Sequence, residues 1–270
     1  MKTPNTVLFL LCFANVFAQL NIDESHSLAG INNIKGNFEW SNITVESYPG
    51  NELKITGEVF INLGENNDAY QLKVDRVDDV LQIRSDIKDV KSLPKYLTIY
   101  KGGEEIFIRI KDRKEIDWRE IKRIHGIDAG EKCSMGTLID IKLTLLVPEG
   151  PQLELETKYG SIEMIECANS MNLKSTYGDL IAALPDLTQA ESSFKSTYGF
   201  VDLSVPDNTG VDLSAHTNHG EIYSNLDWGI DTRQSVNEIY NSRIVGPVNR
   251  GGKKIDVEAL YDNVYLRKKT

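Results

Sequence analysis

The chain has 270 residues and a formal net charge of −10 at pH 7. This acidic balance argues against nucleic acid and anionic lipid as partners, because both select clustered Lys and Arg side chains. The length allows one large β domain or two smaller ones.

The first eighteen residues have the pattern of an export signal. Lys2 supplies a short positive region, and the segment from Val7 to Phe13 is apolar. Val16 and Ala18 then stand at positions −3 and −1 of a cleavage site. We therefore expect cleavage before Gln19 and an exported protein that is periplasmic, located at the outer surface or secreted. No stretch of the chain approaches the roughly 18–20 apolar residues of a membrane span, so none is expected.

We interpret residues 19–137 as an N-terminal β-rich region. It supplies the opening strands of the domain that continues from residue 138 onward. Apolar residues alternate with polar ones in short runs separated by turn residues, which is typical of half-buried strands. The segment 87–136 does not follow this pattern. Its charged stretch from Asp112 to Ile124 is either a short helix or an irregular excursion. Cys133 and Cys167 either form one disulfide or are two separate thiols.

Residues 138–270 contain a repeat. Four variants of one Tyr-Gly motif occur at Gly160, Gly178, Gly199 and Gly220, which are 18, 21 and 21 residues apart. Two further steps of 21 residues reach Asn241 and Asp262, each preceded by Tyr. Because Asn and Asp tolerate a left-handed backbone better than other non-glycine residues, we interpret all six positions as equivalent corners.

Each repeat predicts one strand before the corner and one after it. Apolar residues recur at positions −7 and −5 and at +2 and +4, and a small hydroxyl residue stands at −3. The pattern predicts an all-β fold, a right-handed single-stranded β-solenoid of about 21-residue coils, with six coils stacked in sequence order. The tyrosine at −1 shares the parity of the core positions. We interpret it as stacking on its copy one coil away, and a sugar-binding platform is the alternative.

The sequence lacks the motifs of nucleophilic, metal-dependent and phosphate-binding enzymes. His216 and His219 are three residues apart, but no set of acids or cysteines beside them repeats a metal-ligand spacing. Outward carboxylates are frequent, and no pair of them stands in an apolar setting that would tune a pKa. We therefore expect no catalytic residue, no metal and no cofactor. The five outward carboxylates considered are Glu154, Glu156, Glu163, Asp202 and Glu221.

The segment from Leu138 to Gly150, followed by Leu153 to Ile162, resembles bacterial adhesin-like domains of the DUF4097 type. The ending from Gly251 to Leu266 is similar to the usual close of these domains, and Ile34 to Val45 resembles their opening strands more loosely. The resemblance implies a β-solenoid of the toast-rack kind. It carries no catalytic residue over to this chain.

We consider two functions, and the adhesin label of the first is what the resemblance implies. The first is a non-catalytic, adhesin-like interaction or scaffold module of the cell envelope or surface, which binds a protein or glycan. The second is a polysaccharide-active β-helix hydrolase or lyase. End-to-end or edge self-association is a further possibility for stacked coils.

Three apolar residues occupy positions that parity places on the outside, namely Ile181, Phe200 and Tyr223. On consecutive coils they form a contiguous strip, which is a candidate partner surface. The alternative is that residues before Leu138 cover the strip.

Overall fold

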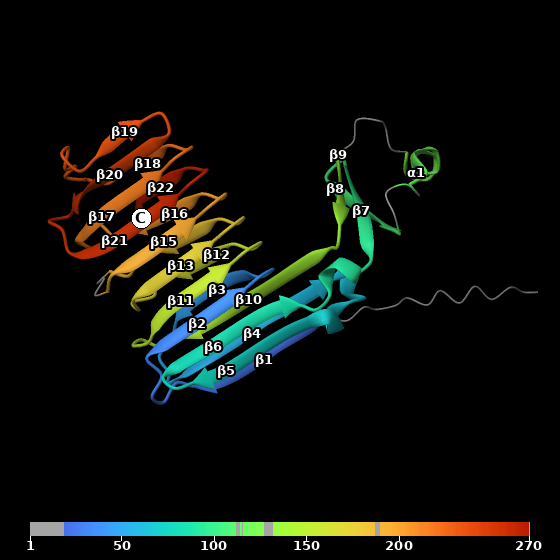
Figure 1. Cartoon of the computed structure of the whole chain (residues 1–270), viewed down its shortest axis with the longest axis horizontal. Coiled ribbons are helices and arrows are strands. Elements are labelled where there is room, and N and C mark those ends of the chain that lie inside the picture. The colour runs from blue at the N-terminus through green and yellow to red at the C-terminus, as the bar shows by residue number, and fades with distance from the viewer. Residues whose placement is uncertain (1–18, 112–113, 115, 127–131, 187–189, 270) are drawn as a thin grey trace, which may run out of the picture.

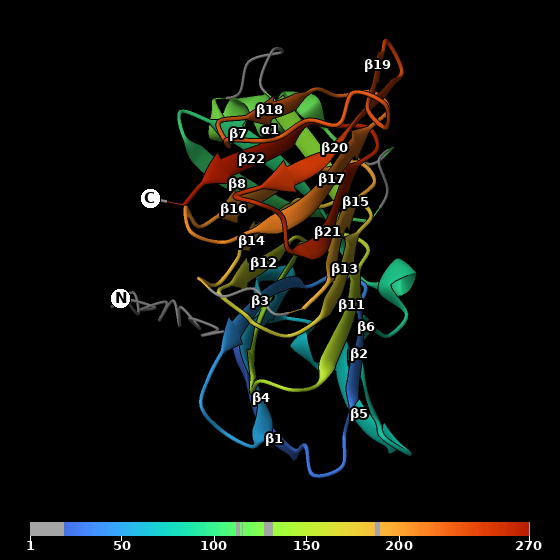
Figure 2. The same cartoon turned by 90° about the vertical axis from the view of Figure 1, so that its left-hand side faces the viewer.

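The computed structural model describes residues 19–111, 114, 116–126, 132–186 and 190–269. The expected export signal lies outside the described residues. Two large β-sheets face each other along the length of the molecule, and a small third sheet projects from one side near their N-terminal end (Figures 1 and 2). The prediction of an all-β fold is confirmed.

The first sheet has nine strands. In their order across the sheet these are β1 (Leu20–Ser27), β4 (Glu52–Ile61), β10 (Ile139–Val147), β3 (Asn42–Ser47), β12 (Ile162–Ile165), β14 (Leu180–Ala183), β16 (Val201–Val205), β22 (Val264–Lys268) and β18 (Ile222–Ser224).

The second sheet has ten strands. In order these are β19 (Val236–Glu238), β20 (Asn241–Val248), β17 (Val211–Thr217), β21 (Lys253–Ala259), β15 (Ser192–Ser196), β13 (Met171–Ser175), β11 (Gln152–Thr157), β2 (Asn33–Phe38), β6 (Val80–Ile87) and β5 (Tyr70–Val77). Short 3₁₀ turns occur at Asn62–Gly64, Asn67–Ala69 and Val90–Ser92.

A coil consists of one strand from the second sheet, a corner, and one strand from the first sheet. The coils stack through parallel pairing, so Leu155 of β11 lies beside Leu173 of β13 and Ile162 of β12 beside Leu180 of β14. The core lies between the two sheets. The inward positions predicted from the repeat are buried, as the alternation along each strand requires: Leu153, Leu155, Met171, Leu173, Leu213, Ala215, Ile255, Val257, Ile162, Met164, Leu180, Ala182, Val201 and Leu203.

The order of the last coils differs from the prediction. The β21–β22 coil with its corner at Asp262 inserts between the Gly199 and Gly220 coils, because β21 pairs with both β15 and β17. Asn241 is not a corner. It begins β20, which runs antiparallel to β17 and ends the parallel stacking.

Residues before 138 add coils at the other end of the stack. Strands β2 and β3 form a coil with its corner at Ser41, which lies against the Gly160 coil. Strand β6 then pairs with β2 and β10 with β3, both in parallel. The segment between β6 and β10 replaces the corner of this outer coil.

That segment forms a lobe with its own small core. Strands β8 (Glu104–Ile110), β7 (Lys95–Lys101) and β9 (Lys132–Gly136) make an antiparallel sheet. Helix α1 (Trp118–His125) places Ile121 against Leu97 and Ile99 of β7. The charged stretch is therefore partly a helix. Asp117 caps its N-terminus through Arg119 N at 3.0 Å, and Gly126 ends it in the left-handed conformation.

Glycine is required at four of the corners because the backbones of neighbouring corners lie too close together for a Cβ atom. The prediction of a left-handed backbone at these positions is wrong. Gly160, Gly178, Gly199 and Gly220 do not have positive φ, and neither does Asp262. A Cβ on Gly178 would lie 2.1 Å from the carbonyl oxygen of Gly160, and one on Gly160 would lie 1.9 Å from that of Ser41. Each corner therefore rests directly on the backbone of the preceding corner.

The hydroxyl at position −3 links consecutive corners. Ser175 Oγ accepts a hydrogen bond from Gly178 N at 3.0 Å and donates to Gly160 O at 3.0 Å. Thr157, Ser196 and Thr217 make the same two contacts in their coils. The Asp262 coil departs from this arrangement, since Ala259 stands at −3. Each hydroxyl satisfies two backbone groups that are shielded from water.

We expect Gly178→Ala to lower the free energy of unfolding by about 2–4 kcal/mol, because the added methyl overlaps a backbone carbonyl that cannot move aside. Gly136→Ala is the matched control, since nothing lies within 4 Å of the Cβ position there. Urea unfolding of both variants checks this. Equal stabilities would contradict the close-approach interpretation.

We expect Ser175→Ala to cost about 1–3 kcal/mol, because it leaves the Gly178 N–H and the Gly160 carbonyl without their partner. Ser193→Ala is the control. The Ser193 hydroxyl is buried and has no hydrogen-bond partner, so its removal should be neutral or slightly stabilising. Thermal unfolding of the pair measures the difference, and a cost no larger for Ser175 than for Ser193 would count against the bridge.

Candidate interaction surface

An aromatic column follows the corners of the stack. Its rings lie in the order Trp40, Tyr159, Tyr177, Tyr198, Tyr261 and His219. Neighbouring ring centroids are 4.3–5.3 Å apart and the planes are within 20° of parallel. Tyr240 packs on His219 at a tilt of 52°. The structural interpretation of the tyrosines as stacked copies is thus confirmed.

The column lies at the surface, and the expectation that it faces the core is wrong. Tyr177, for example, is 53% exposed. The reason is that Tyr and Gly stand in the turn between two strands, where alternation along a strand no longer determines the side-chain direction. Each inner ring of the column packs both of its faces against neighbouring rings. The column therefore presents ring edges to solvent, which do not suit a platform for stacked sugar rings.

A second group of aromatic side chains lies on the outer face of the first sheet. Tyr223 of β18 stacks on Tyr265 of β22, with centroids 5.4 Å apart and planes 12° from parallel. Phe200 meets Tyr265 edge-on at 5.9 Å. We call Phe200, Tyr223 and Tyr265 the aromatic face. It contains two of the three residues selected from the sequence.

Tyr265 was missed by the sequence reasoning, because the expected coil order did not place β22 beside β18. The insertion of β22 also changes the predicted strip. Ile181 pairs with Asp202, and Asp202 in turn pairs with Tyr265. Ile181 is therefore separated from Tyr265 by a carboxylate, and the three selected residues do not form a continuous apolar strip.

Residues before Leu138 do not cover these side chains. Ile181 is 43% exposed and Tyr223 is 48% exposed. Phe200 is half-buried, and its aromatic partner is Tyr265 from the C-terminal coil. The covering alternative is wrong for Ile181 and Tyr223.

Polar groups surround the aromatic face. Arg267 donates from Nε to both carboxylate oxygens of Asp202, at 2.8 and 3.0 Å, and its guanidinium lies 5.2 Å from the Tyr265 ring. The Tyr223 hydroxyl donates to Glu221 at 2.5 Å. This hydrogen bond raises the pKa of the Tyr223 phenol above its ordinary value. The face thus combines aromatic surface with an arginine–carboxylate ion pair and a second carboxylate, and these groups suit recognition of a polar ligand or a protein.

The outward carboxylates are mostly held by partners. Glu154 and Glu156 line a groove of about 420 Å³ on the second sheet, where Lys35 lies 2.9 Å from Glu154 and Lys174 3.2 Å from Glu156. A hydrogen bond from Asn33, followed by one from Lys35, lowers the pKa of Glu154. Glu154 is therefore ionised at neutral pH, whereas a glycosidase acid needs a raised pKa.

The histidines and cysteines lie apart from one another. His216 contacts Glu258 at 3.5 Å, while His219 is part of the aromatic column. Cys133 is exposed on β9 and Cys167 is buried, and both are free thiols, so the disulfide alternative does not hold. Burial raises the pKa of the Cys167 thiol. Among residues 19–269, apart from the short undescribed gaps, no cluster of three His, Cys, Asp or Glu side chains fits a metal ion.

No helix in the described part of the chain is long and apolar enough to cross a membrane. No curated protein matches the sequence significantly. Two solved structures are similar to the chain. A "putative cell adhesion protein" from Clostridium sporogenes has a TM-score of 0.54 at 11% identity, over 93% of this chain and 100% of the other. A "putative adhesin" from Bacteroides fragilis has a TM-score of 0.30 at 11% identity, over 94% of this chain and 99% of the other.

The first of these likenesses shows a shared fold that includes the N-terminal coils. The family model Toastrack DUF4097 matches residues 140–267, which span the coils from β10 to β22. The corners from Gly160 to Asp262, and the parts of the two facing sheets that their coils form, lie within this region. The resemblance to the DUF4097 family that the sequence indicated is confirmed over residues 140–267, which are similar to toastrack domains of that family.

Proposed function

We propose that the protein is exported and acts as a non-catalytic, adhesin-like interaction module at the cell envelope or surface. In this proposal the aromatic face, with Ile181 at its margin, contacts a protein or a glycan. The observation that carries it is the exposed Tyr223, which stacks on the half-buried Tyr265 on the outer face of the first sheet, away from the core. Such groups are enriched at contact surfaces because they bury a large area at little entropic cost.

Two further features support an interaction role. The aromatic face belongs to the parallel-stacked part of the sheet, so its side chains are fixed relative to one another before a ligand arrives. The structural neighbour from Clostridium sporogenes bears the description of a cell adhesion protein, which agrees with this role.

The enzymatic alternative receives less support. A retaining or inverting glycosidase needs two carboxylates across a cleft, one of them with a raised pKa. Glu154 and Glu156 share a groove, but they lie on one strand and each is matched by a lysine. Asp179 does have a raised pKa, mainly through burial, but its carboxylate accepts the Phe200 N–H and supports the corner.

Export has a direct test. Processing at the expected site should yield a protein that begins at Gln19, because Val16 and Ala18 fit the signal-peptidase pocket. N-terminal mass spectrometry of the native protein measures this. An intact Met1 on the native protein would contradict export through a cleaved signal.

The contact surface is tested by binding to producing cells. Tyr223→Ala should weaken the binding of fluorescently labelled protein to these cells about tenfold or more, since it removes one ring of the stacked pair. Lys174→Ala, on the outer face of the second sheet, is the control and should bind as the native protein does. Unchanged thermal unfolding of both variants shows that folding is preserved.

The same assay separates the two partner classes. Periodate treatment of the cells removes binding if the partner is a glycan, and protease treatment removes it if the partner is a protein. Binding that Tyr223→Ala leaves unaltered would reject the aromatic face as the contact surface.

A further inference from the structure

The edge strands differ in length between the two ends of the stack. At the C-terminal end the edge strands β18 and β19 are short, with three residues each. At the N-terminal end the edge strands β1 and β5 have eight residues each. Long edge strands offer rows of unpaired N–H and C=O groups to another chain, whereas short ones do not.

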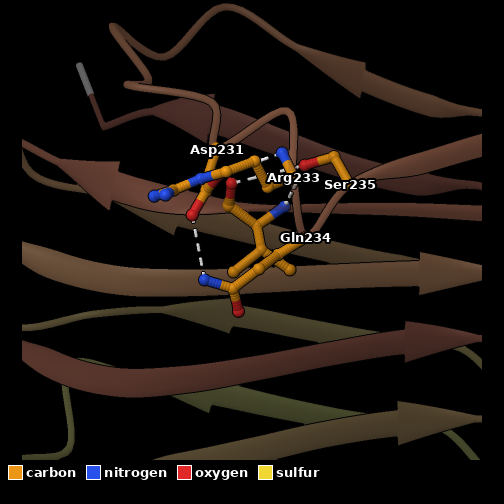
Figure 3. A network of polar contacts seen from close by, with 5 residues as sticks. Asp231, Arg233, Gln234 and Ser235 are labelled. Carbon is orange, nitrogen blue, oxygen red and sulfur yellow. Dashed lines mark hydrogen bonds and ion pairs between the residues drawn. The ribbon is translucent and has the colours of Figure 1, made fainter.

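The C-terminal edge of the second sheet is also interrupted by a turn. The segment beside β20 pairs at Trp228 and again from Val236, and between them the chain turns around Asp231 (Figure 3). The Asp231 carboxylate accepts from Arg233 N at 3.0 Å and from Gln234 Nε2 at 2.9 Å. A turn of this kind breaks the ladder and prevents a further strand from joining.

Strand β5 has no such protection. It lies at the rim of the second sheet, beyond β6 (Figures 1 and 2). Lys88 N donates to Ala69 O at 2.9 Å, just before the two strands pair. Because backbone groups alternate in direction along an antiparallel strand, the N–H and C=O groups of Leu72, Val74 and Arg76 point away from β6.

The charge of Lys73 on β5 is not matched within the described part of the protomer. Lys73 lies directly opposite Arg84 of β6, and like charges in that position are unfavourable. In the described residues Lys73 forms no ion pair. Asp75 contacts Arg84 at 3.9 Å between exposed side chains. A carboxylate beside Lys73 on its free side would offset the repulsion.

We propose that β5 pairs with β5 of a second copy of this chain in an antiparallel, two-fold symmetric dimer. The register with Val74 on the dyad places Lys73 opposite Asp75 of the second copy and Asp75 opposite its Lys73. Leu72 then faces Arg76, and Val74 faces its own copy. The outward backbone groups of Leu72, Val74 and Arg76 pair with the same groups of the second copy.

The packing at this end agrees with the pairing. Ile22, Leu72 and Val74 lie only partly buried against the core at the open end of the two sheets. A second copy extends the sheet past them. Strand β1 is a poorer candidate for pairing with its own copy. Its acidic residues are Asp23 and Glu24, and it has no Lys or Arg that could form ion pairs with them across the strands. Glu24 is already bonded to His26 at 2.9 Å.

Sedimentation velocity over a concentration series tests the proposal, with the full chain expressed with its leader so that the host processes it. We expect a reversible monomer–dimer equilibrium. Lys73→Glu and Asp75→Lys should each weaken the dimer about tenfold or more, because symmetry turns both cross-strand pairs into like-charge pairs. The double variant Lys73→Glu/Asp75→Lys restores opposite charges and should recover the native dissociation constant within about threefold.

Lys174→Glu on β13 is the matched control for charge reversal on the same sheet and should leave the dimer intact. Circular dichroism melting confirms that each variant is folded. A protein that stays monomeric at every concentration overturns the proposal. So does a dimer that neither single variant weakens, or one that the double variant fails to restore.

Discussion

The structure depends on the contact between the glycine of one corner and the backbone carbonyl of the preceding corner. At Gly178 the space for a Cβ is filled by the Gly160 carbonyl oxygen. This contact brings the turns as close together as the strands they connect, so both sheets keep parallel register through the corner. The buried hydroxyl at −3 then satisfies the two backbone groups that the close approach removes from water.

The aromatic column is a consequence of this spacing. Corners separated by one strand spacing place their −1 side chains at a distance that suits stacked rings. The rings cover one another and stiffen the corner, which leaves little of their faces for a ligand. By contrast, Tyr223 lies on the edge strand of the first sheet and stacks on one ring only. The different positions explain why one row of aromatics serves the fold and why the other is a candidate for recognition.

The proposed surfaces lie on different parts of the stack. The aromatic face belongs to coils near the C-terminal end, where the edges are short or interrupted. The dimer edge lies on β5 at the opposite end. A dimer formed through β5 would therefore leave both aromatic faces free. It would present them on one particle and increase the effective affinity for a surface that carries many copies of the partner.

The sequence by itself determined the coil and its inward residues. Alternation around Leu173 and Leu180 specifies which side chains are buried, and the small residue at −3 marks the corner in each repeat. This information is local, because it depends only on the direction of side chains along one strand. For the same reason it failed at the turn, where Tyr177 points to solvent instead of the core.

Only the tertiary structure decided the order of the coils. Every coil presents the same apolar pattern to its neighbours, so the β21–β22 coil fits between two others as well as at the end of the stack. Chain connections and the antiparallel strand β20 select the observed order, and neither leaves a periodic signal. The role of Tyr265 followed from that order, and so did the loss of Asn241 as a corner. The sequence pattern predicts the structure of each coil, but it does not predict which coils lie next to one another in the folded chain.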